Sequence, residues 1–253
     1  MKNNIKILLR VSAVLISIVI WFLIWDLTAK SINNSAFFVG VKDTFLSLKN
    51  LMKTEHFWLV IWGSMKRILL GFALGVAIGS VLAILSHHFY PVNVFVSLGM
   101  GVIKSTPVAS VIMLIWIFFK SGTVPTAIAI LMVAPIIWQN LLDGYNSIDK
   151  GLSEVADVFQ FSPVKRFKYL TLPALLKFFV PAVLTSISLA WKAGIAAEII
   201  AGTRDSIGRF IKDSKASFDS NEMLAWTVAI IVISIVFEAL IKLLIRRYRS
   251  RGT

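Results

Sequence analysis

The sequence predicts an all-α membrane protein of about six transmembrane helices. Of its 253 residues, 57% are hydrophobic and only 15% are charged, whereas soluble domains average about half apolar and about a quarter charged. Six mostly apolar windows approach or exceed the roughly 20 residues that a helix needs to cross the hydrocarbon core. These windows cover residues 11–29, 63–86, 94–119, 124–142, 174–201 and 223–245.

The first window follows three basic residues, Lys2, Lys6 and Arg10, an arrangement that also opens a cleaved signal peptide. The apolar stretch that begins at Val11 continues to Ala29 without a clear small-residue cleavage pattern. We therefore expect a retained transmembrane helix here.

The second window carries Gly71, Gly75 and Gly79 at intervals of four residues. Small residues at this spacing let two helix backbones approach closely in lipid, where packing replaces the hydrophobic driving force. We expect tight packing within one subunit, and contact across a dimer is the alternative.

The basic residues predict an orientation in the membrane. A net charge of +13 would suggest nucleic acid in a soluble protein, but here lysine and arginine gather at helix ends and in loops, so we expect no nucleic-acid partner. The positive-inside rule places the C-terminus in the cytoplasm. Six spans then put the N-terminus and the loop 143–169 there too, although segments 30–56 and 203–222, assigned outside, also contain lysine and arginine. The C-terminal basic residues are Lys242, Arg246, Arg247, Arg249 and Arg251.

Several kinds of chemistry are excluded by residue content. The chain has no cysteine, and its three histidines, His56, His87 and His88, offer no spaced set of metal ligands. It also lacks the Gly-x-x-x-x-Gly-Lys-Ser/Thr loop that cradles nucleotide phosphates. We therefore expect no catalytic residue, no metal site and no cofactor bound by this chain.

The loop between the fourth and fifth windows predicts a helix, a turn and a second helix. Ser153 followed by Glu154 is typical of a helix start, and Ser162 followed by Pro163 supplies a cap and a first-turn proline for the second helix. Exposed aromatic side chains among charges indicate a docking surface, while an amphipathic segment lying on lipid headgroups is the alternative. The aromatic residues are Phe159, Phe161 and Phe167.

At this loop the chain resembles the permease subunits of type I ABC importers, within the subgroup for nitrate, sulfonates and taurine. The signature of that family reads Glu-Ala-Ala, three residues, Gly, nine residues, Ile, one residue, Leu-Pro. Glu154 and Ala156 match its first element, and Leu172 with Pro173 match its last at the same spacing.

Three positions depart from the signature. Val155 and Leu170 replace an alanine and an isoleucine, which are mild apolar changes, but Gln160 stands where the family has glycine. We expect the glycine to supply a positive φ in the turn, where another residue costs roughly 1–2 kcal/mol. Either Gln160 accepts this strain or the turn differs in this protein.

The resemblance covers about residues 55–250. Four further segments carry it in order: Ser64–Phe72 before and around the first glycine, the proline-containing Lys104–Ala109, Trp191–Glu198 in the fifth window, and the glycine-centred Ser206–Ile211.

The resemblance implies an architecture and partners. Residues 1–58 would form an N-terminal transmembrane helix with an external segment, and residues 59–250 a permease core with a coupling helix near 150–164. A second copy of the permease, a cytoplasmic ABC ATPase dimer that holds ATP and Mg, and an external substrate-binding protein would complete a multi-pass importer of the bacterial inner membrane. The expected ATPase-coupling residues are Glu154, Val155, Ala156, Asp157, Phe159, Gln160, Phe161, Ser162 and Pro163.

Charged residues inside the windows are candidates for a translocation path, because charge in a bilayer is costly. A surplus of cations would suit a small anion such as a sulfonate or nitrate, and a vitamin precursor is the other substrate class. Alternatively, Arg67 extends its guanidinium to the membrane interface, and Lys104 and Lys192 pair with Glu198. Met113 and Trp116 are expected either to touch a ligand or to pack in the bilayer.

A channel or an ion-coupled transporter that works without an ATPase is the competing functional class. Such proteins more often carry buried acids in their spans, and the windows here contain almost none besides Glu198 and Glu238. The sequence therefore favours the importer permease.

Overall fold

The computed structural model describes residues 2–32, 34 and 36–249, and all its regular elements in this range are helices. The chain forms two compact units, Met1–Leu59 with Phe210–Ile231, and Val60–Arg209 with Val232–Thr253. Near the two ends, at residues 2–11, 242 and 244–249, the structure describes the helix and not the side chains, so the basic side chains on which the predicted orientation rests lie outside the description.

The first unit consists of the N-terminal helices α1 and α2 and of parts of three later helices. Trp25 of α1 donates its indole N–H to the backbone oxygen of Val39, 2.9 Å away, which fastens α1 to the segment before α2. A ring contact between Phe57 and Trp226, with centroids 4.9 Å apart, holds α3 against α11. The unit contains α1 (Lys2–Ile32) and α2 (Val41–Met52) whole, together with the start of α3 (Glu55–His88), most of α10 (Ile207–Ala216) and the first part of α11 (Ser220–Arg249).

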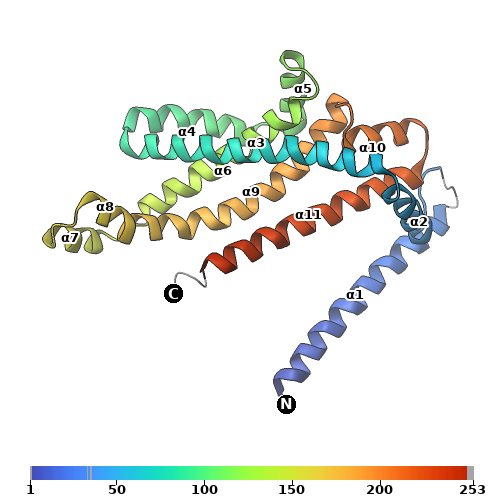
Figure 1. The fold of residues 1–253 in the computed structure, drawn as a ribbon, viewed down its shortest axis with the longest axis horizontal. Helices are drawn as coiled ribbons and strands as arrows, with labels where there is room; N and C mark the ends of the chain where they lie inside the picture. Colours follow the sequence, from blue (N-terminus) through green and yellow to red (C-terminus); the bar gives the residue numbers. More distant parts are fainter. Residues whose placement is uncertain (1, 33, 35, 250–253) are drawn as a thin grey trace. The chain divides into compact units, whose positions relative to one another are not determined.

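The second unit contains an apolar core in which α6 packs along α9 (Figure 1). Ile112, Val124, Ile128 and Ala197 are completely buried where these two helices meet α5. The remaining helices of this unit are α4 (Tyr90–Ser105), α5 (Val108–Phe118), α6 (Val124–Asn146), α7 (Lys150–Val158), α8 (Pro163–Arg166), the π-helix η1 (Phe167–Thr171) and α9 (Leu172–Ala201).

The predicted window 94–119 is not one continuous helix, which corrects the sequence-based expectation. It divides into α4 and α5, which meet at 108°. Pro107 has no N–H to donate and disfavours the helical conformation at Thr106, whose φ and ψ of −84° and 132° are extended. In the described residues, five helices are long and apolar enough to span a membrane, or six if the bent pair is one span. The all-α fold and the number of spans are thus confirmed.

The three glycines of the second window pack α3 against α6 within one subunit. A Cβ atom on Gly71 would lie 2.4 Å from the backbone oxygen of Thr126, and one on Gly75 would lie 2.7 Å from the Cβ atom of Val133. A Cβ atom on Gly79 would lie 2.6 Å from another backbone oxygen of α6. Packing within the subunit, the favoured prediction for this stripe, is confirmed.

Candidate functional site

Helix α7 begins earlier than the sequence analysis predicted. Asp149 caps it, because its Oδ1 atom accepts hydrogen bonds from the amides of Gly151 and Leu152, at 2.6 and 3.2 Å. The predicted start at Ser153–Glu154 is therefore wrong, and the missed signal was an aspartate, which caps helices as well as serine does.

The turn after α7 places Gln160 in the left-handed region, with a φ of 49°. The amide of Gln160 donates to the oxygen of Asp157 at 3.0 Å, and that of Phe161 donates to the oxygen of Ala156 at 2.9 Å. These two bonds form a Schellman motif, a helix ending that usually carries glycine at the left-handed position. Gln160 thus accepts the strained conformation, and the turn keeps the geometry that a glycine would allow.

The second short helix starts where the sequence predicted. The Ser162 hydroxyl accepts a hydrogen bond from the amide of Lys165 at 3.4 Å, and Pro163 occupies the first turn. The chain then passes through η1 into α9, so this segment is continuous with a membrane-spanning helix.

Arg166 fastens α8 to α7. Its Nη1 atom donates to Oδ1 of Asp157 at 2.5 Å, and its Nη2 atom donates to the hydroxyl of Ser153. An ion pair this exposed contributes only about 0.2–1 kcal/mol, but a guanidinium held at two points fixes an orientation. The two helices therefore form a clasped pair.

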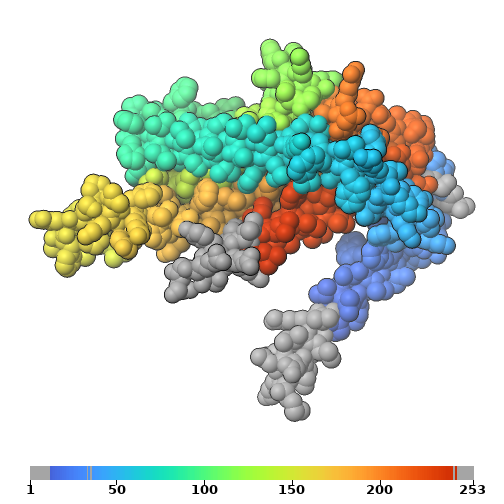
Figure 2. Space-filling view, viewed as in Figure 1, coloured from blue at the N-terminus to red at the C-terminus, as the bar shows by residue number. Residues whose placement is uncertain are grey.

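The clasped pair presents an apolar outer surface. Ala156 is buried, whereas Val155, Phe159 and Phe161 are 50%, 71% and 40% exposed, and Glu154 is exposed beside them. Helices α7 and α8 lie beyond the ends of α6 and α9 (Figure 1), and the space-filling view shows the segment in yellow as a projection (Figure 2). This is the arrangement expected of a docking surface.

A second group of residues surrounds the buried carboxylate of Glu198, which has no exposed surface. It accepts hydrogen bonds from the Ser64 hydroxyl at 2.8 Å, from Nε and Nη2 of Arg67 at 3.2 and 3.0 Å, and from the Gly208 amide at 3.3 Å. A Cβ atom on Gly208 would lie 2.4 Å from that of Glu198, so only glycine allows this approach. The network joins α3, α9 and α10.

This network corrects two of the alternatives drawn from the sequence. Arg67 does not extend to the interface, because its guanidinium pairs with Glu198 and also donates to the backbone oxygen of Asp205 at 3.1 Å. Glu198 pairs with neither Lys104 nor Lys192. No local sequence pattern could indicate that Arg67 pairs with Glu198, because the two residues lie 131 positions apart in the chain.

The other path candidates lie apart from this network. Lys104 is exposed, with its Nζ atom 3.5 Å from Oε1 of Gln139 and 5.8 Å from the centroid of the Trp138 ring. Lys192 is exposed on α9, and in the described part of the chain neither lysine forms an ion pair. Two α5 side chains, Met113 and Trp116, are 54% and 40% exposed.

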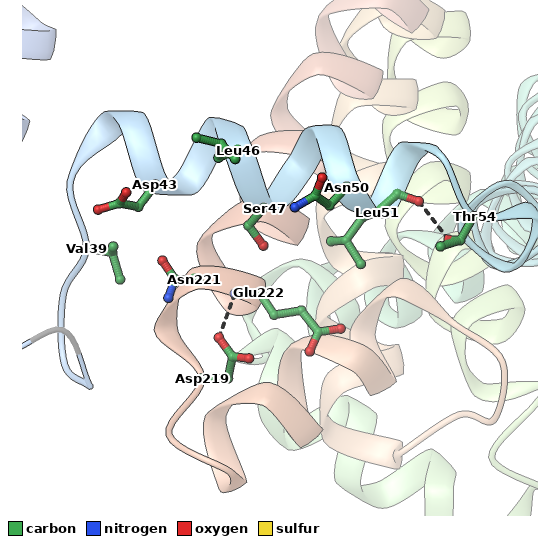
Figure 3. Close-up of a pocket in the computed structure, with 10 residues that line it drawn as sticks. All are labelled: Val39, Asp43, Leu46, Ser47, Asn50, Leu51, Thr54, Asp219, Asn221 and Glu222. Carbon is green, nitrogen blue, oxygen red and sulfur yellow. Dashed lines mark hydrogen bonds between the residues drawn. The ribbon is translucent and has the colours of Figure 1, made fainter.

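The first unit holds a separate polar hollow of about 620 Å³ beside α2 (Figure 3). Asp43 on α2 faces the start of α11, where Asp219 accepts a hydrogen bond from the amide of Glu222 at 3.0 Å. Among the described residues, no group of three or more histidine, cysteine, aspartate or glutamate side chains could hold a metal ion.

Long apolar helices interrupted by a clasped, exposed helix pair define a multi-pass membrane protein with a projecting helical segment. The model of the family of binding-protein-dependent transport system inner membrane components matches residues 71–250, and the chain belongs to this family. It is thus the permease component of an ABC importer, whose ATPase is a separate subunit. This assignment decides against the channel or ion-coupled transporter.

Individual relatives agree with this assignment. The chain is 24% identical over 204 residues to a protein of Bacillus subtilis (strain 168) named as an aliphatic sulfonates transport permease, SsuC, with 80% of this chain and 73% of that protein covered. An amino acid ABC transporter structure has a TM-score of 0.63 at 18% identity, covering 75% of this chain and 94% of its own. A bacterial ABC transporter involved in import of the polysaccharide alginate has a TM-score of 0.62 at 19% identity, covering 97% and 98%. The structural matches show the shared fold.

Proposed function

We propose that this permease imports a small anion of the sulfonate, taurine or nitrate kind. The relative named for aliphatic sulfonates supports this substrate class. The observation that carries the proposal is that neither Lys104 nor Lys192 forms an ion pair in the described part of the chain. The buried carboxylate of Glu198 is already paired with Arg67.

Lys104 and Lys192 would therefore offer uncompensated positive charge to a passing ligand. An unpaired cation in a membrane protein is costly unless it faces water or meets a counter-charge. An anionic substrate would supply that counter-charge at each lysine in turn. Glu198 and Arg67, by contrast, would act as a brace between helices, because the carboxylate is fully buried and accepts four hydrogen bonds.

The clasped pair α7–α8 would couple this path to the ATPase. Residues Glu154–Pro163 carry the exposed apolar surface, and the Arg166 contacts make the pair a rigid lever of the kind that a two-state transporter needs. The proposed complex contains two copies of this chain, each with residues 59–250 as its permease core and 1–58 as an added segment. It also contains an ATPase dimer with ATP and Mg, and an external binding protein.

The proposed orientation places both termini and α7–α8 in the cytoplasm. This orientation requires the bent pair α4–α5 to cross the bilayer as one span, which gives six crossings in total. The positive-inside rule supports it through the basic residues at both ends of the sequence.

Uptake by the reconstituted importer tests the substrate proposal. The Lys104→Met/Lys192→Met variant is expected to take up taurine, an alkyl sulfonate or nitrate at least about tenfold more slowly, since each charge-assisted contact is worth roughly 1.5–3 kcal/mol. Lys66→Met is the matched control, because Lys66 is exposed and lies over the Trp62 ring at 5.2 Å. Unchanged uptake by the double variant, at equal assembly with the ATPase, would contradict the proposal.

A further inference from the structure

A second hollow, of about 350 Å³, lies in the second unit where α3 and α6 end and the clasped pair begins. Helix η1 contributes three of the residues that line it. None of the lining residues is acidic. Its polar lining consists of His87, His88, Tyr145, Ser153, Arg166 and Thr171.

The polar groups of this hollow are held in place, and several have unused hydrogen-bonding capacity. The ring of His87 stacks on that of Tyr145, with centroids 4.0 Å apart and planes at 9°. Nδ1 of His88 lies 2.9 Å from the backbone oxygen of Ile84, which fixes the second imidazole. Within the described residues, the His87 ring and the hydroxyl groups of Tyr145 and Thr171 make no side-chain hydrogen bond.

The hollow lies at the ends of two candidate membrane spans, because those of α3 and α6 end at His88 and Asn146. A site at the end of a span lies nearer to the headgroups than to the centre of the hydrocarbon core. Apolar side chains of Phe167 and Leu170 complete its wall. The wide turn of a π-helix, which η1 forms here, is frequently found at functional sites.

We propose that this hollow binds a phosphate group, carried by an anionic lipid headgroup or by a soluble phosphate compound. Phosphate oxygens accept hydrogen bonds from guanidinium, imidazole and hydroxyl donors, and Arg166, His87 and Tyr145 supply one of each. No carboxylate lines the hollow, and the carboxylate of Asp157 beside it is paired with Arg166. Basic pockets between membrane helices at the interface bind lipid headgroups through this chemistry.

A bound phosphate would share Arg166 with the clasped pair. The same guanidinium that lines the hollow holds Asp157 and Ser153 of α7. Occupancy would therefore tie the clasped pair to the ends of α3 and α6. An effect on transport rests on the coupling role proposed above, whereas phosphate binding itself does not.

Native mass spectrometry of the purified full chain tests the lipid source. We expect phosphatidylglycerol to bind more tightly than phosphatidylcholine, and the His87→Gln/His88→Gln variant to bind phosphatidylglycerol about tenfold more weakly. His56→Gln is the matched control, because His56 is exposed and lies in the first unit. Tyr145→Phe keeps the ring that stacks on His87 and removes only the hydroxyl, so a loss of about threefold is expected even if the double variant folds poorly.

Calorimetric titration with inorganic phosphate tests the soluble source on the same proteins. Phosphate binding that the Tyr145→Phe and histidine variants weaken, together with no preference for phosphatidylglycerol, would assign the hollow to a soluble phosphate compound. The proposal would be overturned if the protein bound neither phosphatidylglycerol nor phosphate. It would also be overturned if wild type, Tyr145→Phe and His56→Gln bound them equally well. Neither assay requires the ATPase or transport, so the outcome is independent of the importer's substrate.

Discussion

The carboxylate of Glu198 accepts two hydrogen bonds from the guanidinium of Arg67, at 3.0 and 3.2 Å, and Glu198 is completely buried. The pair joins the N-terminal half of α3 to the end of α9. The buried Glu198 carboxylate is tolerable there only beside a counter-charge, because a lone buried charge has neither water nor a counter-ion.

The first prediction concerns this ion pair. Arg67→Met leaves Glu198 buried without its counter-charge, and we expect a loss of about 3–5 kcal/mol in the free energy of unfolding. Thermal unfolding in detergent measures it as a lower Tm. Lys66→Met changes the neighbouring exposed cation and should leave Tm nearly unchanged. The double variant Arg67→Met/Glu198→Gln should recover part of the loss, and failure to recover any would argue against charge as the cause.

The second prediction concerns the packing of α3 on α6. Gly71→Ala places a Cβ atom 2.4 Å from the backbone oxygen of Thr126, which a rigid helix cannot avoid, so we expect a destabilisation of about 1–3 kcal/mol. Gly101→Ala is the control within α4, where a Cβ atom meets nothing within 4 Å. There the helix propensity of alanine should raise stability by up to about 1 kcal/mol. Equal Tm values for the two variants would contradict the packing seen here.

The third prediction concerns the turn after α7. Gln160→Gly removes the cost of a left-handed conformation in the folded turn, but it also gives the unfolded chain more conformational freedom. The net stability of the turn should therefore rise by up to about 1 kcal/mol. Hydrogen exchange of the Phe161 amide, bonded to Ala156, should slow by up to about fivefold. Gln160→Val should speed it, because a branched side chain suits this conformation least. The same exchange rate in all three proteins would refute this account.

The fourth prediction concerns docking of the ATPase. Phe159→Ala removes the most exposed aromatic ring of the clasped pair, and if this ring is a binding hot spot worth about 2 kcal/mol, the ATPase should bind at least about tenfold more weakly. Copurification in mild detergent and titration of the ATPase measure it. Phe37→Ala is the control, since Phe37 is 64% exposed but lies in the first unit. ATPase retention by both variants alike would place the docking surface elsewhere.

Local sequence rules were sufficient for part of the candidate site and failed at one of its boundaries. The Ser162–Pro163 start of α8 was correct because a cap and a first-turn proline act within a few residues. The start of α7 was misplaced because Asp149 and Ser153 are both good caps, and only the hydrogen bonds that Asp149 accepts from the Gly151 and Leu152 amides show which one the chain uses.

By itself, the sequence determined that the chain is a helical membrane protein with a helix-turn-helix loop between its fourth and fifth windows. Those properties follow from apolar run length and from caps, which depend on neighbouring residues. Tertiary structure alone decided the pairing of Arg67 with Glu198 and the stacking of His87 on Tyr145. Each of these depends on side chains that meet only after distant helices pack, and no short window of sequence contains both partners.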